Sequence, residues 1–329
     1  MLAVRYYGIG QVKAEEIPRP VCGPGQALVR VACAGICGSD LHIFRKGMFV
    51  ARVPETMGHE FSGVVEEVGA GVGELSPGDH VVGDPRVFCG RCRWCLRGDF
   101  NLCPGLGFIG EVSQGCFAEY LVMDAKKLLK VPPEIDLRRA ALVEPLAVAL
   151  HIAGRGRLSA GDHLGIAGAG PVGLLTLIVA RSMGVEKVTV IDVAPARLEL
   201  AARLGATVLA AFPEEPADRP DVLVEAAGLE ETLAGAVRWL KPEGRLVMAG
   251  IYEDRVSLDP NDIVVKELEL IGLSAYGTSD LVKAVQLIAG GLVDVAPLIS
   301  RVLPLNEAAR GFSLLTAAEK TECKILLAP

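Results

Sequence analysis

A glycine-rich turn between a predicted strand and a predicted helix is the feature that most constrains the fold of this chain. Residues 168–173 have the sequence Gly-Ala-Gly-Pro-Val-Gly, after the apolar segment 163–167 and at the start of a helical pattern over 171–183. The first glycine permits a tight turn, the second lets the backbone approach a pyrophosphate at the helix N-terminus, and the third lets the helix pack closely on the strand. The candidate cofactor-binding residues of this turn are Gly168, Gly170, Pro171, Val172 and Gly173.

An acidic residue at the end of the next strand favours NAD as the cofactor. Asp192 follows the apolar segment 187–191, about 20 residues after the glycine-rich turn. A carboxylate at this position binds both ribose hydroxyls and repels a 2′-phosphate, so NAD is preferred over NADP. Arg197, one turn into the following helix, is a further candidate contact, because it either stacks on adenine or accommodates a phosphate. The alternative interpretation is a glycine-rich turn in an α/β protein of another kind.

The rhythm of apolar segments divides the chain near residue 148. Before that point, short strands are broken by Gly and Pro, which predicts an irregular, mainly β domain. From about 149, apolar strands alternate with helical patterns, which indicates βαβ units and a parallel sheet. The predicted fold class is therefore α/β, with a doubly wound Rossmann sheet. The predicted strands are 27–33, 63–68, 80–82, 163–167, 187–191, 221–225, 244–248 and 323–327, and the predicted helices are 171–183, 195–204, 230–240 and 279–289.

Charge and hydropathy exclude several classes of protein. The formal net charge is −7 at pH 7, so nucleic-acid binding, which needs a basic face, is not expected. The N-terminus lacks the apolar stretch of a secretory signal. The most apolar segment, 172–183, contains Arg181 and is shorter than a membrane span. We therefore expect a cytoplasmic protein without a membrane partner.

Four of the nine cysteines are closely spaced. Disulfides are not expected in a cytosolic chain with an odd number of cysteines, so metal binding is the preferred interpretation. The pattern C-x2-C-x2-C-x7-C supplies four thiolates for a closed, structural zinc site with no position left for substrate. An iron–sulfur cluster is the alternative, although the ferredoxin pattern has a shorter final spacing. The ligands of this site are Cys89, Cys92, Cys95 and Cys103.

Two short segments near the N-terminus contain residues suited to a catalytic metal. Residues 35–42 have the sequence Gly-Ile-Cys-Gly-Ser-Asp-Leu-His, and residues 58–60 are Gly-His-Glu. A thiolate from Cys37, an imidazole from His59 and a carboxylate from Glu60 suit a zinc site that keeps one position open. The remaining cysteines and histidines are interpreted as ordinary side chains: Cys22, Cys33, Cys116, Cys323, His80, His151 and His163.

In this order, the motifs resemble the zinc-dependent medium-chain alcohol dehydrogenase family. The resemblance extends over essentially the whole chain and includes residues 143–151, Val-Glu-Pro-Leu-Ala-Val-Ala-Leu-His. It implies a GroES-like catalytic domain made of residues 1–148 and 275–329, with two zinc ions per chain, and a NAD-binding Rossmann domain over 149–274. It also implies a homo-oligomer, with a tetramer favoured over a dimer.

The resemblance implies a role for each residue of the catalytic site. The implied ligands of the catalytic zinc are Cys37, His59, Glu60 and Glu144. Glu60 looks like a ligand that exchanges with water during turnover, and Glu144 like a fourth ligand, direct or through water, as in the polyol and threonine dehydrogenase branches. Ser39 is expected to take the proton of the alcohol and His42 to pass it on through the cofactor ribose. The zinc ion lowers the pKa of the hydroxyl, and the nicotinamide accepts the hydride.

The substrate is a small alcohol, and the resemblance favours a secondary alcohol of a polyol or vicinal diol. Glu144 and the segment 145–151 resemble the polyol branch, whereas Ile43 and Phe44 replace the Tyr-Trp that this branch often has. The alternative enzyme is an L-threonine 3-dehydrogenase. The alternative outside enzymes is a catalytically silent zinc- and NAD-binding module. Aromatic candidates for the pocket wall are Phe44, Phe108 and Tyr276.

One segment departs from the family pattern. Residues 212–220, Phe-Pro-Glu-Glu-Pro-Ala-Asp-Arg-Pro, are fewer than the family usually has at this place, where a helix is common. A parallel crossover normally needs about a dozen residues or more. We therefore predict a shortened or irregular crossover without a multi-turn helix, and little effect on the chemistry.

Overall fold

The chain folds into two compact units. The computed structural model describes residues 1–214 and 218–329. The first unit comprises Met1–Glu144, Gly277–Ala318 and Lys324–Pro329, and the second comprises Pro145–Tyr276 and Glu319–Cys323. The sequence-based boundaries lay at 148/149 and 274/275, so they differ from these by a few residues. The sequence also assigned residues 319–323 to the first unit, whereas the structure groups them with the second.

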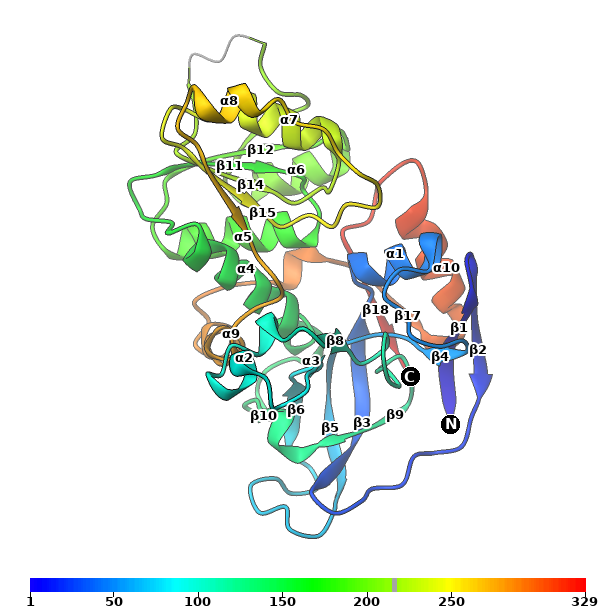
Figure 1. Ribbon diagram of the computed structural model, residues 1–329. Coiled ribbons are helices and arrows are strands. Elements are labelled where there is room, and N and C mark those ends of the chain that lie inside the picture. The colour runs from blue at the N-terminus through cyan, green and yellow to red at the C-terminus, as the bar shows by residue number, and fades with distance from the viewer. Residues whose placement is uncertain (215–217) are drawn as a thin grey trace. The chain divides into compact units, whose positions relative to one another are not determined.

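The first unit is built on largely antiparallel sheets (Figure 1). Its strands are β1 (Leu2–Gly8), β2 (Gln11–Glu16), β3 (Gln26–Gly35), β4 (Glu55–Thr56), β5 (Glu60–Val68), β6 (His80–Gly83), β7 (Arg86–Val87), β8 (Gly107–Phe108), β9 (Tyr120–Asp124), β10 (Leu128–Lys130), β17 (Ile299–Pro304) and β18 (Lys324–Ala328). The main sheet has the order β10-β6-β5-β3-β18-β17, and β9 also pairs with β3. A three-stranded sheet, β2-β1-β4, and the pair β7-β8 complete this unit. The central strand β3 therefore pairs both with strands that follow it in the first unit, β5 and β9, and with β18 at the C-terminal end of the chain.

Short helices connect these strands. The helices of the first unit are α1 (Gly38–Lys46), α2 (Arg93–Leu96), α3 (Leu137–Ala140), α9 (Thr278–Ala289) and α10 (Ala308–Thr316). α1 follows β3 directly and ends at Gly47, whose φ of 68° lies in the left-handed region that favours glycine. The sequence predicted α9 but not α1, which contains Ser39 and His42.

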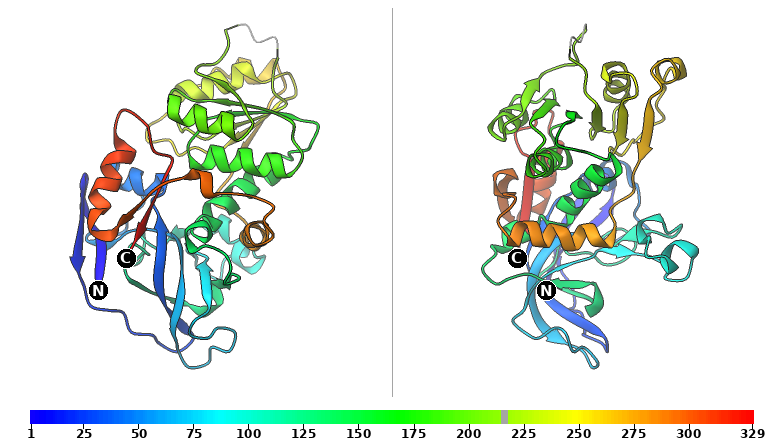
Figure 2. Two further views of the ribbon diagram at one scale, coloured as in Figure 1. Left: turned by 180° about the vertical axis from the view of Figure 1, so that it is seen from behind. Right: turned by 90° about the vertical axis from the view of Figure 1, so that its left-hand side faces the viewer.

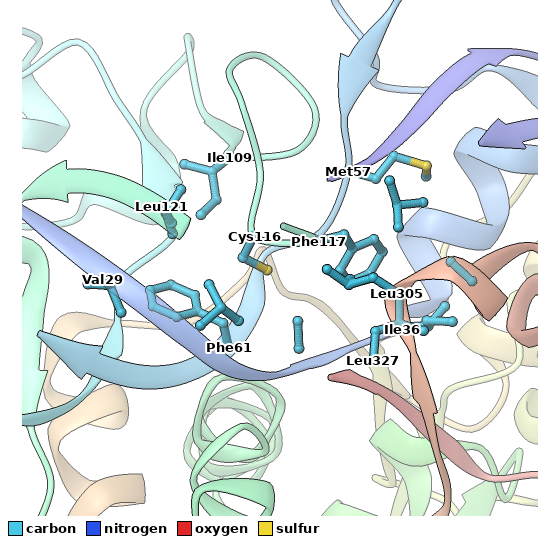
Figure 3. Packing of buried hydrophobic residues seen from close by; sticks show 14 of the residues in the cluster. Val29, Ile36, Met57, Phe61, Ile109, Cys116, Phe117, Leu121, Leu305 and Leu327 are labelled. Atoms are coloured by element: carbon cyan, nitrogen blue, oxygen red, sulfur yellow. The ribbon is translucent and has the colours of Figure 1, made fainter. Parts of the chain in front are cut away.

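The core of the first unit joins strands that are distant in sequence. Val29 of β3, Phe61 of β5 and Leu121 of β9 are buried in one hydrophobic cluster (Figure 3). The rings of Phe117 and Phe312 in the same cluster meet at 77° with their centroids 6.4 Å apart. Burying an apolar side chain of this size contributes about 1.5–3 kcal/mol. The cluster therefore stabilises the register of β3 and β5, whose ends position the candidate site.

The second unit is a parallel sheet with helices on both faces (Figure 2). Its strands are β11 (His163–Ala167), β12 (Lys187–Ile191), β13 (Thr207–Leu209), β14 (Val222–Glu225), β15 (Arg245–Met248) and β16 (Glu269–Gly272). Its helices are α4 (Val143–Arg155), which begins at the unit boundary, α5 (Pro171–Ser182), α6 (Pro195–Arg203), α7 (Glu230–Trp239) and α8 (Pro260–Val264). The order β13-β12-β11-β14-β15-β16 is the Rossmann order, which confirms the predicted fold class. All five residues of β11 are buried, as expected for a strand that is covered on both faces.

The crossover from β13 to β14 is short. Residues 210–214 and 218–221, on the two sides of the segment that lies outside the described residues, contain no helix. Phe212 packs its ring edge-on against Trp239 of α7, with ring centroids 6.0 Å apart. A Cβ atom at Gly235 would overlap the Phe212 ring, so glycine at this position of α7 makes room for it. The predicted irregular crossover agrees with these described residues.

No helix in the described ranges combines the length and the apolar character needed to cross a membrane.

Candidate metal centres and cofactor site

The turn from β3 into α1 positions Cys37. Cys37 is the N-cap residue of α1, and its N–H donates to the buried Asp40 carboxylate at 2.8 Å. Burial raises the pKa of Asp40 to about 6. Burial, followed by the charge of Glu60, also raises the pKa of the Cys37 thiol. A thiolate at this position therefore requires a cation beside it.

Strand pairing brings His59 and Glu60 to Cys37. β3 and β5 are antiparallel, with Gly35 opposite Glu60. Gly58 has a φ of +91°, and a Cβ atom there would overlap the Phe117 ring, so the residue before His59 has to be glycine. The Cys37 sulfur, a ring nitrogen of His59 and a carboxylate oxygen of Glu60 all lie within 4.8 Å of one another.

This donor set fits a catalytic zinc ion. One thiolate, one imidazole and one carboxylate leave a tetrahedral metal ion with an open position. His59 is buried, and its Nδ1 atom has no hydrogen-bond partner among the described residues. A buried polar atom without a partner is unfavourable unless a ligand satisfies it. The residues present therefore match the metal that the sequence predicts.

The other predicted catalytic residues lie on α1 and in the first turn of α4. Ser39 and His42, three residues apart on α1, are both half-buried, and His42 Nδ1 lies 3.4 Å from Arg45 Nη2. Glu144 is buried in the first turn of α4, close enough to His59 for its charge to act on the imidazole. Its carboxylate is not among the donor atoms that approach one another within 4.8 Å.

The structure adds Lys324, which the sequence did not single out. Lys324 is the first residue of β18, and its ammonium nitrogen lies 2.7 Å and 2.9 Å from the two carboxylate oxygens of Glu60. Both side chains are 1% exposed. The only sign of this residue in the sequence is a lysine at the start of an otherwise apolar strand.

The three aromatic candidates for a pocket wall differ in their surroundings. The ring centroid of Phe108 lies 5.5 Å from that of His59, so this residue lies beside the donor cluster. Phe44 packs on Phe312, with centroids 5.2 Å apart, as part of the core. Tyr276 is fully buried in the second unit. Of the three, Phe108 is the one that contacts a candidate metal ligand.

The four cysteines of the second predicted site lie together in the loop between β7 and β8. The four sulfur atoms lie within 4.8 Å of one another. The Cys95 sulfur is 3.5 Å from that of Cys92 and 4.0 Å from that of Cys89. A tetrahedron with metal–sulfur bonds of about 2.3 Å has edges of about 3.8 Å, whereas a disulfide is about 2.05 Å long. The spacing therefore fits four thiolates around a single ion.

Backbone N–H groups and burial shift the pKa values of two of these thiols in opposite directions. Backbone N–H groups of Arg91 and Cys92 lower the pKa of Cys89 to about 6. Cys92 is the N-cap residue of α2, and its sulfur accepts the N–H of Cys95 at 3.5 Å. Burial raises the pKa of Cys95 to about 12. Because burial disfavours the thiolate form of Cys95, a cation bound beside it would favour that form.

The glycine-rich turn has the geometry of a dinucleotide site. Gly168 has a φ of +106°, and a Cβ atom at Gly173 would overlap the Gly168 carbonyl oxygen. The space above Gly170 is open, because an added Cβ atom there would meet only Arg197 Nη1, at 4.0 Å. Pro171 and Val172 form the first turn of α5. Backbone can therefore approach a ligand closely at Gly170, with a guanidinium group beside it.

Asp192 joins the strand end to this turn. Its Oδ2 atom accepts the N–H of Ala169 at 2.7 Å, and its Oδ1 atom accepts the N–H of Ala194 at 2.8 Å. The carboxylate is thereby fixed beside the glycine-rich turn, as ribose binding requires. Arg197 donates from Nη2 to the Glu322 carbonyl at 3.4 Å, which leaves Nη1 facing the turn.

Two surface cavities lie apart from these groups. One, of about 520 Å³, is in the second unit and is lined by Phe212, Trp239, Arg219, Arg238 and Lys266 among others. The other, of about 440 Å³, is in the first unit, between residues 78–80 and 130–133. Neither contains a predicted site residue, so neither identifies the substrate.

Comparison with known proteins places these features in a family. Residues 23–133 match the alcohol dehydrogenase GroES-like domain, and residues 171–290 match the zinc-binding dehydrogenase family. D-xylulose reductase A of Aspergillus oryzae is 35% identical over 331 residues, which cover 95% of this chain and 92% of that protein.

Solved structures agree with this comparison. A protein described as a zinc-binding dehydrogenase of Sinorhizobium meliloti 1021, determined with bound NADP, is 34% identical with a TM-score of 0.92. The 2R,3R-butanediol dehydrogenase of Bacillus subtilis is 32% identical with a TM-score of 0.91. Each comparison covers 100% of this chain and 99% of the other. The likeness therefore includes both units.

Proposed function

This chain belongs to the zinc-dependent medium-chain alcohol dehydrogenase family, and on that premise we propose that it oxidises a secondary alcohol of a polyol or vicinal diol to a ketone, with NAD as hydride acceptor. It is an enzyme that acts on CH–OH donors, which removes the catalytically silent alternative. The observation on which the proposal rests is the buried Cys37–His59–Glu60 cluster. The names of two relatives, a D-xylulose reductase and a butanediol dehydrogenase, favour a polyol or diol over L-threonine.

Each candidate site residue of the first unit has a proposed role in the reaction. Cys37 and His59, with Glu144 and Glu60 as the nearby carboxylates, would hold a zinc ion, which would supply a Lewis acid that lowers the pKa of the substrate hydroxyl. A nicotinamide cofactor bound at the glycine-rich turn would supply the hydride acceptor. The Ser39 hydroxyl accepts the proton of the alcohol and transfers it towards His42. Because Cys37 caps the same helix that contains Ser39 and His42, α1 fixes the proton path relative to a metal ligand.

A panel of alcohols tests this function. The purified protein is expected to reduce NAD with sugar alcohols or 2,3-butanediol, and not with L-threonine. A chelator should stop the reaction and added zinc should restore it. A protein that binds zinc and NAD but turns over none of these alcohols would contradict the polyol or diol assignment.

We further propose that NAD is preferred over NADP, because Asp192 places a negative charge beside the glycine-rich turn. Asp192→Asn keeps the size of the side chain but removes its charge. The ratio of kcat/KM for NAD to that for NADP is expected to fall roughly tenfold, since one charge–charge repulsion at this distance contributes about 1–2 kcal/mol.

The matched control for this variant is Glu199→Gln on α6, which removes the same charge from an exposed side chain of the same unit. It should leave the cofactor ratio unchanged. Equal shifts in both variants would mean that the general charge of the unit, and not Asp192, sets the preference.

We propose two zinc ions per chain and a homo-oligomer, with a tetramer favoured over a dimer. The edge strand β16 supports self-association, because its outer edge is not paired within the sheet and Leu270 is 39% exposed. Val264 and Val265 nearby are 70% and 81% exposed. Light scattering on the purified protein measures the assembly, and a monomeric mass would contradict it. The cytoplasmic location stays a prediction.

A further inference from the structure

Glu225 is a fully buried acidic residue that the proposed reaction does not use. It is the last residue of β14, in the middle of the parallel sheet, and it is 0% exposed. Its Oε1 atom accepts the N–H groups of Ala227 and Gly228, both at 2.9 Å, and lies 2.7 Å from the Thr232 hydroxyl. Its Oε2 atom accepts the Tyr252 hydroxyl at 2.7 Å. All four partners are neutral, so none of them cancels the negative charge of the carboxylate.

The same residue joins the loops at the carboxyl ends of two neighbouring strands, β14 and β15 (Figure 1). The Glu225 carbonyl oxygen accepts the N–H of Ala249 at 2.8 Å and that of Gly250 at 2.9 Å, both in the loop after β15. The two loops are also in direct backbone contact. A Cβ atom at Gly228 would overlap the Ile251 carbonyl oxygen, and one at Gly250 would overlap the Gly228 nitrogen. Glu225 therefore holds both loops in place, with its backbone and with its side chain.

The loop after β14 lies against the glycine-rich turn. The N–H of Ala226 donates to the Ala167 carbonyl at 2.8 Å, and a Cβ atom at Gly168 would lie 3.0 Å from the Ala227 nitrogen. The sheet order makes this a topological switch point, because the chain continues from β11 to β12 and β13 on one side, and from β14 to β15 and β16 on the other. Open α/β sheets bind their ligands in the crevice at such a point.

The two halves of a dinucleotide would extend to opposite sides of this crevice. Asp192, the candidate ribose-binding residue, follows β12, which pairs with β11 on the side away from β14. Gly170, where the backbone is open to a pyrophosphate, is the N-cap residue of α5 after β11. A dinucleotide held at these two residues would place its nicotinamide half over the carboxyl end of β14. Glu225 lies buried beneath that end.

We propose that the buried charge of Glu225 favours the oxidised form of the cofactor. The inference rests on the dinucleotide site of the proposed function. The nicotinamide ring of NAD⁺ carries one positive charge, whereas the ring of NADH is neutral. A buried carboxylate acts on a nearby charge with little screening by salt and water. Glu225 thus has two effects that can be separated: its hydrogen bonds position the loops, and its charge attracts NAD⁺ more than NADH.

The test is Glu225→Gln, which keeps the length of the side chain and removes its charge. The amide oxygen can still accept from Ala227 and Gly228, and the amide N–H can donate to the Tyr252 hydroxyl, so the loops should keep their conformation. The dissociation constant of NAD⁺ is expected to rise roughly fivefold to tenfold, whereas that of NADH should change less than about twofold. Calorimetry for NAD⁺ and cofactor fluorescence for NADH measure both constants without turnover.

A merely structural role for Glu225 predicts a different result. Glu225→Gln would then bind both forms as the wild type does, or would weaken both by the same factor, and either result would overturn the proposal. If Glu225→Gln does not fold, Glu225→Ser is measured in the same way, because its small neutral side chain leaves space for water at the four donors. The dissociation constants of NAD⁺ and NADH should separate in the same direction.

Two control variants distinguish charge from contact. Thr232→Val removes a hydroxyl beside the Glu225 carboxylate but keeps the charge, so the ratio of the two dissociation constants should not change. Glu231→Gln removes the same charge from an exposed side chain on α7 and should also keep the ratio. A shift in Glu231→Gln as large as that in Glu225→Gln would contradict a specific role for the buried carboxylate. A wild-type protein that binds neither NAD⁺ nor NADH would overturn the proposed cofactor site itself, which is a different result from an unchanged ratio in Glu225→Gln.

Discussion

Replacing Cys37 by alanine is expected to remove the zinc of the catalytic site and to lower kcat/KM by roughly a thousandfold or more. A Lewis acid of this kind contributes several kcal/mol of transition-state stabilisation, and about 1.4 kcal/mol corresponds to a factor of ten. The fold should persist, since Asp40 caps α1 by accepting a backbone N–H of residue 37, which alanine retains. Zinc content by mass spectrometry and initial rates of NAD reduction measure the two effects.

The matched control is Cys33→Ala in β3, four residues earlier. Cys33 is also buried, and burial raises the pKa of its thiol to about 11, but it belongs to neither group of candidate metal ligands. This variant should keep both its zinc and most of its activity. Normal turnover and two zinc ions per chain in Cys37→Ala would show that the metal is held elsewhere.

The second large effect is expected at the four-cysteine loop, where the change affects stability and not chemistry. Cys103→Ala removes one of four thiolates, so one zinc ion per chain should be lost. Metal binding in such sites contributes directly to folding. A loss of at least about 2 kcal/mol would lower Tm by roughly 4–8 °C in a unit of this size. The rate constant of the protein that remains folded at 25 °C should change less than tenfold.

Cys22→Ala provides the comparison for this variant. Cys22 is a half-buried thiol outside both groups of candidate metal ligands, and its sulfur lies 3.3 Å from the Gln26 carbonyl. Its loss should change neither metal content nor Tm. An unchanged Tm in Cys103→Ala, with both zinc ions still present, would mean that the loop does not depend on a metal ion.

Local pattern was sufficient to predict most of the second unit. The strands β11 and β12 have the predicted bounds, and α5 ends within one residue of its prediction. Strands that are covered on both faces are continuous apolar runs, and the glycine-rich turn marks the junction with the helix. The helices α1 and α4 were missed, because residues 35–46 and 143–155 were interpreted by their motifs and not by their periodicity.

The surroundings of the candidate site could be predicted only in part. The sequence shows which donor groups are available, since Cys37 and the four cysteines offer thiolates and His59 offers an imidazole. Donors of these types indicate zinc. Which of these side chains lie close together, however, depends on which strands pair. Pairing between strands that are far apart in the sequence cannot be recognised from a local sequence pattern. Lys324 and Glu60 are 264 positions apart and meet because β18 and β5 both pair with β3. The individual roles of the site residues stay predictions that the experiments above test.

The discontinuity of the first unit also has a consequence for synthesis of the protein. The second unit is almost contiguous, so it can fold as soon as residues 145–276 have left the ribosome, whereas β3 waits for β18. At about 5–20 residues per second, the 264 positions from Glu60 to Lys324 take roughly 13–50 s to translate. During that interval the nascent chain presents the Cys37 thiol and the Glu60 carboxylate without Lys324, the buried cation that pairs with Glu60 in the finished fold.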